Sequence, residues 1–271
     1  MEVVPLPSAR DIGALAADIV EALVRRSPGA VLGLATGSSP LPLYRELVRR
    51  HRDGHAPSYD AVRCFTLDEY VGLPADHEQT YRQTVFRELT DDLGIARDRV
   101  SSPDPDPAGL PTAGERYEAE LDGAGGVDLQ VLGIGTDGHL AFNEPGSSLA
   151  SATRIKTLTE QTRRDNARFF SSSAEVPRHV LTQGLGTILR ARHVLLVAWG
   201  EGKAEAVAAA VEGPLSATCP ASVLQLHPHA TVLLDEGAAG GLARADHYRA
   251  VHAGKPSWQG YGPGSALPTG Q

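Results

Sequence analysis

Apolar residues follow two spacings along the chain, one typical of amphipathic helices and one typical of buried strands. Residues 12–23 have helical spacing, and Ser8 precedes them as a candidate N-cap. Residues 30–35 form a short, wholly apolar run, which predicts a strand buried on both faces. A helix is then expected over residues 40–51, with Ser39 as its cap and a proline at its first position.

The same alternation continues through most of the sequence. It predicts further helices over residues 80–89, 113–121 and 203–211. It predicts further strands over residues 61–65, 127–132, 193–198, 223–226 and 231–234. Strands that alternate with helices indicate an α/β protein with a mostly parallel sheet flanked by helices. We expect one domain over residues 1–253, followed by a flexible Gly/Pro/Ser-rich tail over residues 254–271.

Composition narrows the class of protein. A chain of 271 residues is long enough for one large α/β domain. Its two cysteines, Cys64 and Cys219, are far apart, which argues against a disulfide framework or a zinc site. No apolar stretch is long enough to span a membrane and no export signal is visible, so we expect a cytoplasmic protein. A net charge of -8 argues against nonspecific nucleic-acid binding, so a phosphorylated ligand would need a local basic pocket.

Three loops that follow predicted strands carry candidate chemistry. The first contains Thr36, Gly37, Ser38 and Ser39, which combine a flexible backbone, three hydroxyls and a following helix N-terminus. This combination suits a phosphate, although an ordinary capped turn has the same composition. The Gly-Lys-Ser/Thr ending of a Walker loop is absent from it.

The second loop begins with the adjacent carboxylates Asp68 and Glu69, directly after a predicted strand. A carboxylate in this position can act as a general base. The alternative is that Asp68 caps a turn and Glu69 is solvated.

The third loop is the most informative. It has three glycines within six residues, together with Asp137, His139, Asn143 and Glu144. A histidine close to carboxylates is held in one tautomer, which is the usual arrangement for proton transfer. A single histidine that only completes a core hydrogen bond is the alternative, but the density of functional groups favours catalysis.

The sequence resembles the glucosamine-6-phosphate deaminases, which share a fold relationship with 6-phosphogluconolactonases and ribose-5-phosphate isomerases. The matching stretches, in the family's order, are LGLATGSSPLPLY, FTLDEYVGLP, GIGTDGHLAFNEPGSSLAS, TRIKTLT, NARFF and LQLHP. They cover residues 32–227, most of the chain. The resemblance implies a modified Rossmann-like fold, no cofactor and no metal.

The resemblance also implies a mechanism. His139, oriented by Asp137 and Glu144, would open the pyranose ring of glucosamine 6-phosphate. Asp68 would then remove the C2 proton, give an enediol-type intermediate and return a proton at C1. Loss of the amine as ammonia leaves fructose 6-phosphate, a step of amino-sugar catabolism.

The substrate phosphate would lie on residues 36–39, with positive charge from Arg168 and Lys203. The sequence departs from the family's usual pattern just before Lys203, where Trp199 and Glu201 alter the expected pocket wall. A lysine solvated in the first turn of a helix is the alternative for Lys203.

The resemblance places a mobile lid at about residues 154–182, which would exclude water from the bound substrate. Ser147, Arg154 and Lys156 match positions that bind N-acetylglucosamine 6-phosphate in allosteric family members. Regulation is therefore a hypothesis, and two basic residues two positions apart also fit a solvated face. The resemblance also implies a homo-oligomer.

Other functions remain as alternatives. A lactonase or isomerase acting on another sugar phosphate is the nearest, and the AFNEP run and Asp68 weigh against it. A sugar-phosphate sensor would require a DNA-binding module. A Rossmann dehydrogenase would require a G-x-G-x-x-G fingerprint, which residues 33–37 lack. His227 and His229 flank a proline without a nearby third ligand, so we interpret them as strand-end residues.

Overall fold

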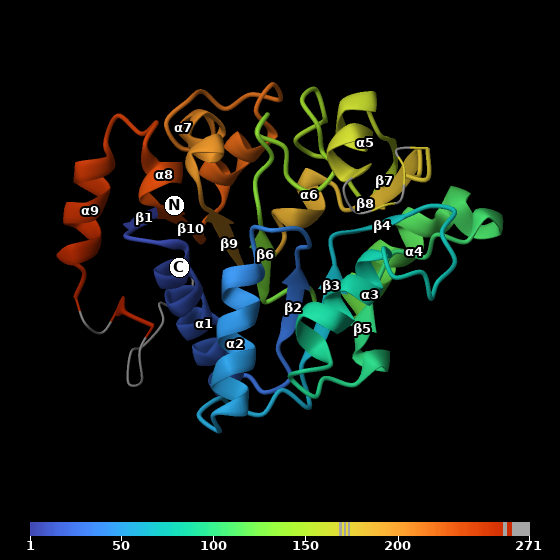
Figure 1. Ribbon diagram of the computed structural model, residues 1–271, viewed down its shortest axis with the longest axis horizontal. Helices are drawn as coiled ribbons and strands as arrows, with labels where there is room; N and C mark the ends of the chain where they lie inside the picture. The colour runs from blue at the N-terminus through green and yellow to red at the C-terminus, as the bar shows by residue number, and fades with distance from the viewer. Residues whose placement is uncertain (168–169, 171, 173, 257–258, 262–271) are drawn as a thin grey trace.

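A seven-stranded parallel sheet forms the centre of the computed structural model, which describes residues 1–167, 170, 172, 174–256 and 259–261 (Figure 1). All adjacent strands of this sheet are paired in parallel. In spatial order the strands are β1 (Glu2–Leu6), β10 (Ala230–Asp235), β9 (His193–Ala198), β6 (Leu129–Leu132), β2 (Val31–Leu34), β3 (Arg63–Thr66) and β5 (Val100–Ser101). The chain runs from β2 outward to β5 and then returns to the other side of β2 with β6. The order of the strands therefore reverses between β2 and β6.

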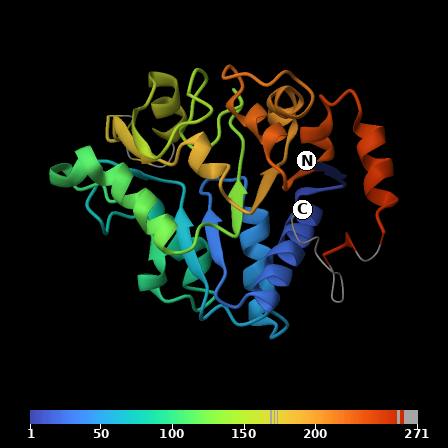
Figure 2. The ribbon, with the colours of Figure 1, turned by 180° about the vertical axis from the view of Figure 1, so that it is seen from behind.

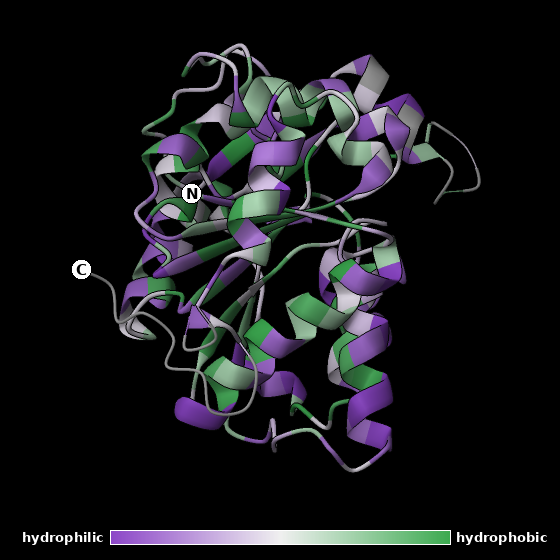
Figure 3. Cartoon of the chain, turned by 90° about the vertical axis from the view of Figure 1, so that its left-hand side faces the viewer, coloured by the Kyte–Doolittle hydropathy of each residue, from purple (hydrophilic) through white to green (hydrophobic). Residues whose placement is uncertain are grey.

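Helices cover both faces of this sheet because the strands are apolar on both faces. One core cluster joins the sheet to α1 (Ala9–Arg26), α2 (Leu41–Arg52) and the short π-helix η1 (Phe86–Thr90), which continues α3 (Tyr81–Val85). The cluster on the other face involves α4 (Leu110–Gly123), α6 (Leu185–Ile188), α7 (Ala204–Val211) and α8 (Glu236–Ala239). Figure 2 shows the molecule from behind, and Figure 3 shows the strands from the side between the helices.

A second, three-stranded antiparallel sheet lies beside the large one and carries part of the candidate site. Its order is β4 (Asp68–Tyr70), β8 (His179–Thr182) and β7 (Arg154–Thr157). The helix α5 (Glu160–Asn166) follows β7 and lies above this small sheet (Figure 1).

Most predicted elements are confirmed, including the Ser8 cap, whose side chain accepts the Asp11 N–H at 3.3 Å. Two predictions are wrong. Residues 223–226 belong to the 3₁₀-helix η6 (Pro220–Leu226), where the Gln225 amide bonds to carbonyl oxygens at the end of α7. Ser39 does not cap α2, because Pro40 occupies the N-cap position with helical φ and ψ and no side-chain hydrogen bond.

The two ends of the domain meet beside the edge strand β1. After α9 (Ala245–Ala253), Lys255 Nζ lies 2.8 Å from Glu2 Oε1, and the Tyr261 hydroxyl donates to Glu2 Oε2 at 3.3 Å. Tyr261 is buried and packs on the core. Lys255 and Tyr261, both within the expected tail, thus contact the domain, while residues 262–271 lie outside the described part. No helix among the described residues is long and apolar enough to cross a membrane.

Candidate active site

The candidate site lies at the carboxyl ends of β2 and β6, where the strand order reverses. Ligands of open α/β sheets bind at this kind of position. The loop after β2 exposes Gly37 and Ser38, and Gly37 has a φ of +85°, which favours glycine. A Cβ on Gly133, at the end of β6, would lie 2.8 Å from Ser39 Cβ. The missing side chain of Gly133 therefore lets the two loops come together.

The loop after β6 holds an acid–imidazole pair. Asp137 Oδ1 lies 2.6 Å from His139 Nδ1 and also accepts the backbone N–H of His139 at 3.1 Å. The hydrogen bond from His139 is the main cause that lowers the pKa of Asp137. The carboxylate therefore stays charged and holds the proton on Nδ1, which leaves Nε2 as the ring nitrogen able to accept a proton. The predicted pairing of Asp137 with His139 is present.

Buried hydrogen bonds attach this loop to the small sheet. The Asn143 amide donates to the carbonyl oxygens of Leu140 and Gln183, at 3.0 and 2.8 Å. The backbone N–H of Phe142 donates to Thr182 Oγ1 at 3.2 Å. Asn143 is thus an anchor of the loop, a role that its spacing in the sequence does not reveal.

Asp68 lies on the same side of the small sheet as this loop. It is directly opposite Thr182 in the antiparallel pairing of β4 and β8. Opposite residues of an antiparallel pair project from the same face, and the Thr182 hydroxyl reaches the loop. Burial, and secondly the charge of Glu69, raises the pKa of Asp68 well above its ordinary value. A carboxylate with a raised pKa is a stronger base.

The alternative for Asp68 and Glu69 is wrong. Asp68 belongs to a strand instead of capping a turn, and Glu69 is only 2% exposed. The Glu69 carboxylate accepts three backbone N–H groups, from Tyr70, Tyr81 and Arg82. The Tyr81 and Arg82 donors belong to the first turn of α3, where helix N–H groups lack partners within the helix. A distant segment thus provides the contacts that allow Glu69 to be buried.

Glu144 joins the loop to α5. Its Oε1 atom accepts from the hydroxyl groups of Thr162 at 2.5 Å and Thr159 at 3.2 Å. Within the described residues, the Glu144 carboxylate forms its hydrogen bonds with these two threonines and not with His139. Thr159 is also the N-cap of α5.

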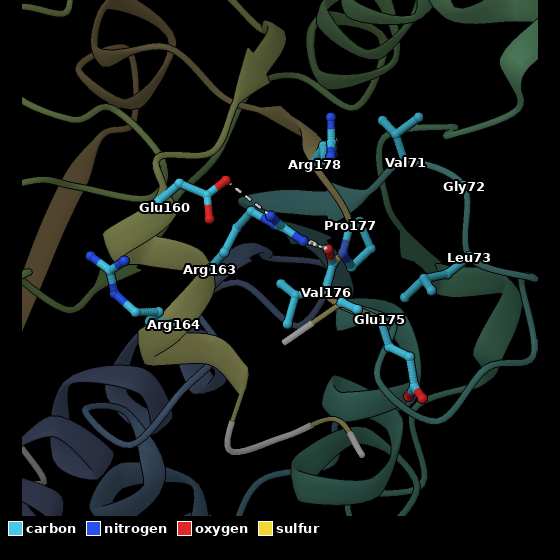
Figure 4. Close-up of a pocket in the computed structure, with 11 residues that line it drawn as sticks. Val71, Gly72, Leu73, Glu160, Arg163, Arg164, Glu175, Val176, Pro177 and Arg178 are labelled. Atoms are coloured by element: carbon cyan, nitrogen blue, oxygen red, sulfur yellow. Dashed lines mark hydrogen bonds and ion pairs between the residues drawn. The ribbon is translucent and has the colours of Figure 1, made fainter. Parts of the chain in front are cut away.

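A cavity of about 680 Å³ separates α5 from the turn after β4. Val71 and Leu73 line one side, Arg163 projects from α5 on the other side, and Arg178 lies between them (Figure 4). The Arg163 guanidinium donates to Val176 O and pairs with Glu160 Oε1 at 3.1 Å. Neither Asp68 nor His139 lines this cavity, so the loops at the carboxyl edge define the candidate site instead.

The remaining predicted residues are distributed around these loops. Lys203 is half-buried and ends the 3₁₀-helix η5 (Glu201–Lys203), which follows β9. Trp199 is partly exposed just before it. Arg168 lies outside the described residues. Arg154 and Lys156 project from β7, and the Ser147 side chain is buried.

Two supports of the site carry no recognisable sequence signal. Ala141 has a φ of +51°, a left-handed conformation that costs free energy in a non-glycine residue and recurs at functional sites. Residues 217–221, which end in the first turn of η6, bind both ends of the same loop: Gly146 N donates to Ala217 O, and Ala221 N donates to Gly138 O, each at 2.8 Å. Long-range backbone contacts of this kind depend on the fold and leave no motif.

The fold and the candidate site together define an α/β enzyme whose candidate catalytic groups lie beside the carboxyl ends of a parallel sheet. The profile of the family described as glucosamine-6-phosphate isomerases/6-phosphogluconolactonase matches residues 8–233. The chain belongs to this family.

Similar proteins are found within the same family. The chain is 62% identical to the glucosamine-6-phosphate deaminase of Arthrobacter sp. (strain FB24), over 96% of this chain and 100% of that protein. It is 59% identical to the glucosamine-6-phosphate deaminase of Streptomyces coelicolor, over 96% of this chain and 100% of that protein. A solved structure of a monomeric glucosamine-6-phosphate deaminase has a TM-score of 0.85 and 39% identity, and the match covers 89% of this chain and 100% of that one. The 6-phosphogluconolactonase from Trypanosoma brucei shares the fold, with a TM-score of 0.71 and 22% identity. That match covers 89% of this chain and 98% of the lactonase.

Proposed function

We propose that this protein is a glucosamine-6-phosphate deaminase, which converts glucosamine 6-phosphate and water to fructose 6-phosphate and ammonia. The observation that carries the proposal is the placement of Asp68 on the face of β4 that meets the His139 loop. A base and a proton-transferring imidazole on one side of the sheet suit ring opening followed by enolisation. The names of the 59–62% identical relatives support the same substrate.

The reaction begins with ring opening. His139 Nε2, with Nδ1 held by Asp137, takes the proton of the anomeric hydroxyl and returns it to the ring oxygen, which releases a C1 aldehyde. The aldehyde makes the neighbouring C2 proton acidic. Asp68 then removes that proton while a proton of the amino group passes to the C1 oxygen, which gives an enediol-type intermediate. Asp68 returns its proton to C1 as the double bond moves to C2 and nitrogen. Water hydrolyses the resulting imine at C2, which gives the ketone and ammonia.

The phosphate is proposed to bind the loop of residues 36–39. The exposed backbone at Gly37 and the hydroxyls of Thr36, Ser38 and Ser39 support this assignment, since they can donate to phosphate oxygens. Lys203 and Arg168 would supply positive charge.

The segment that contains α5 is proposed as the lid. The contact of Glu144 with Thr159 and Thr162 supports a link between lid position and the catalytic loop. Closure would remove water from the imidazole and the carboxylates.

Regulation is a separate part of the proposal. N-acetylglucosamine 6-phosphate would bind Ser147, Arg154 and Lys156 in a homo-oligomer. The Ser147 hydroxyl is buried and, among the described residues, lacks a hydrogen-bond partner, which supports a polar ligand at this position. The similar solved structure is described as monomeric, so the mass in solution must be measured directly. An unchanged saturation curve with the effector would remove this part and leave the activity intact.

The first experiment measures ammonia and fructose 6-phosphate from glucosamine 6-phosphate in the wild type, Asp68→Asn and Asp122→Asn. Asp122 is a matched control because its side chain is 70% exposed on α4. The proposal expects both products from the wild type and the control, and a loss of about 100- to 10,000-fold in kcat for Asp68→Asn. Absence of ammonia from the wild type, with or without N-acetylglucosamine 6-phosphate, would overturn it and direct attention to phosphogluconolactones.

A further inference from the structure

Glu69 is a buried carboxylate that the proposed reaction does not use. Its Oε1 atom accepts N–H groups from Tyr70 at 2.8 Å and Tyr81 at 2.9 Å, and its Oε2 atom accepts from Arg82 at 3.0 Å. Burying a charge is unfavourable unless hydrogen bonds replace those of water. Three backbone donors do so here, and two of them, Tyr81 and Arg82, are N–H groups at the start of α3 that lack partners within the helix.

The position of Glu69 in the strand separates it from the reacting groups. Consecutive residues of a strand project to opposite faces, so Asp68 and Glu69 lie on opposite sides of β4. Asp68 shares its face with Thr182 and the His139 loop, whereas Glu69 contacts α3. Glu69 therefore does not touch the substrate but fixes the back of the strand that carries the base.

We propose that Glu69 is a positioning residue of this site, a buried anion that fixes β4 to α3 and makes Asp68 a stronger base through its adjacent charge. This inference rests on the proposed function, in which Asp68 removes the C2 proton.

The electrostatics of the pair support this role. Burial is the main cause that raises the pKa of Asp68, and the charge of Glu69 is the second. Burial also raises the pKa of Glu69, but its three backbone hydrogen bonds act in the opposite direction. Hydrogen bonds to the charged form favour ionisation. Glu69 is therefore the member of the pair that ionises first, and Asp68 keeps its proton to a higher pH.

The other ionisable groups around the pair do not replace Glu69. On β8, the residues opposite β4 are Thr182, Leu181 and Val180, which do not ionise. The phenols of Tyr70, Tyr81 and Tyr117 face the pair, and burial raises the pKa of each, so they are neutral near pH 7. The Arg82 charge on α3 lowers the pKa of Glu69, which favours its ionised form further.

Glu69→Gln tests the inference because it removes the charge and keeps the shape. The matched control is Thr80→Ala, which removes the other cap of α3, the Thr80 hydroxyl that accepts Gln83 N–H at 3.3 Å, without changing the charge. The measurements are kcat, KM and the pH dependence of kcat/KM for ammonia release.

The inference expects Glu69→Gln to lower kcat at least about 10-fold. It also expects the acid limb, the fall of kcat/KM at low pH as Asp68 is protonated, to move to lower pH because the neighbouring negative charge is gone. Thr80→Ala should lower the urea midpoint and leave the acid limb where it is in the wild type. An acid limb that does not move in folded Glu69→Gln would overturn the inference, even if the activity falls. A wild type that releases no ammonia would instead contradict the proposed function.

If Glu69→Gln does not fold, Glu69→Asp provides the second test. It keeps the charge with a side chain one methylene shorter, so some backbone hydrogen bonds weaken. The acid limb should then stay close to that of the wild type, because the charge beside Asp68 is retained. If the acid limb of Glu69→Asp instead moves down in pH toward the ordinary carboxyl pKa, although the charge is retained, the inference is overturned.

Discussion

A Cβ atom on Gly135 would lie 2.2 Å from Nδ1 of His139, so the imidazole ring rests directly over the backbone of this glycine. Atoms at that separation overlap, so any side chain at residue 135 must displace the ring. The glycine-rich start of the loop therefore has a steric cause, in addition to the turn that Gly138 makes with a φ of +82°.

Gly135→Ala should displace the imidazole from Asp137 and lower kcat about 100-fold or more, since displacements near 1 Å have effects of this size. Steady-state ammonia release measures the effect. Gly123→Ala, at the end of α4, is the control, because an added Cβ there meets nothing within 4 Å. Equal kcat values in the two variants would show that the ring does not depend on Gly135.

Asp137→Asn should also reduce kcat by about 100- to 10,000-fold, with little effect on the fold. The partly exposed amide can still occupy the space, but it cannot hold the Nδ1 proton by a charge-assisted bond of 2.6 Å. The split between kcat and KM checks this expectation. A change confined to KM would place Asp137 in substrate binding instead.

Gly133→Ala should lower stability and raise KM, because the new methyl group would meet Ser39 in the proposed phosphate loop. The cost of such overpacking is about 1–3 kcal/mol. A second substitution, Ser39→Gly, removes the atoms that clash, so the double variant should unfold at a higher urea concentration than Gly133→Ala alone. Additive effects of the two substitutions would contradict the predicted contact.

The protein should lose stability as the pH falls below about 6.5, in part through His193. Burial, and then the nearby His229, His227 and Lys255, lowers the pKa of His193 to about 3. The unfolded chain takes up a proton near pH 6.5, the ordinary histidine value, whereas the folded chain does not until about pH 3. The contribution to stability is thus complete above pH 6.5 and is lost progressively toward pH 3.

At pH 5 this effect of His193 amounts to about 2 kcal/mol. His193→Gln cannot titrate and retains a partner for the Thr231 hydroxyl, which lies 2.9 Å from His193 Nε2. Urea unfolding at pH 7.5 and pH 5.0 should therefore show a smaller loss for this variant than for the wild type. Equal losses would mean that His193 does not couple to folding.

Much of the parallel sheet was predictable because its strands carry a continuous apolar signal. Residues 193–198 were predicted as a strand and form β9 over the same range. The error at residues 223–226 arises because a short apolar run is compatible with a strand and with a buried helical turn. Strand β4 was missed because its sequence, Asp-Glu-Tyr, has little resemblance to a half-buried strand.

In the site, the sequence identified Asp137 and His139 as a pair because they are neighbours in the chain. It could not locate Asp68 relative to them, since that relation depends on the pairing of β4 with β8, over 100 residues later. Glu69 shows the same limit. Its burial is decided by backbone N–H groups of Tyr81 and Arg82, which no local pattern around Glu69 reveals.

The pairing of β1 with β10 imposes an order on how the molecule folds as it is synthesised. β1 comprises residues 2–6 and leaves the ribosome early, whereas its only neighbour in the described part of the sheet, β10, comprises residues 230–235. The first strand must therefore remain without its partner until β10 has been translated, more than 200 residues later. The ion pair between Glu2 and Lys255 forms later still. Completion of the sheet consequently waits for the synthesis of β10, and nascent chains truncated before this strand should expose an unfilled edge at β9.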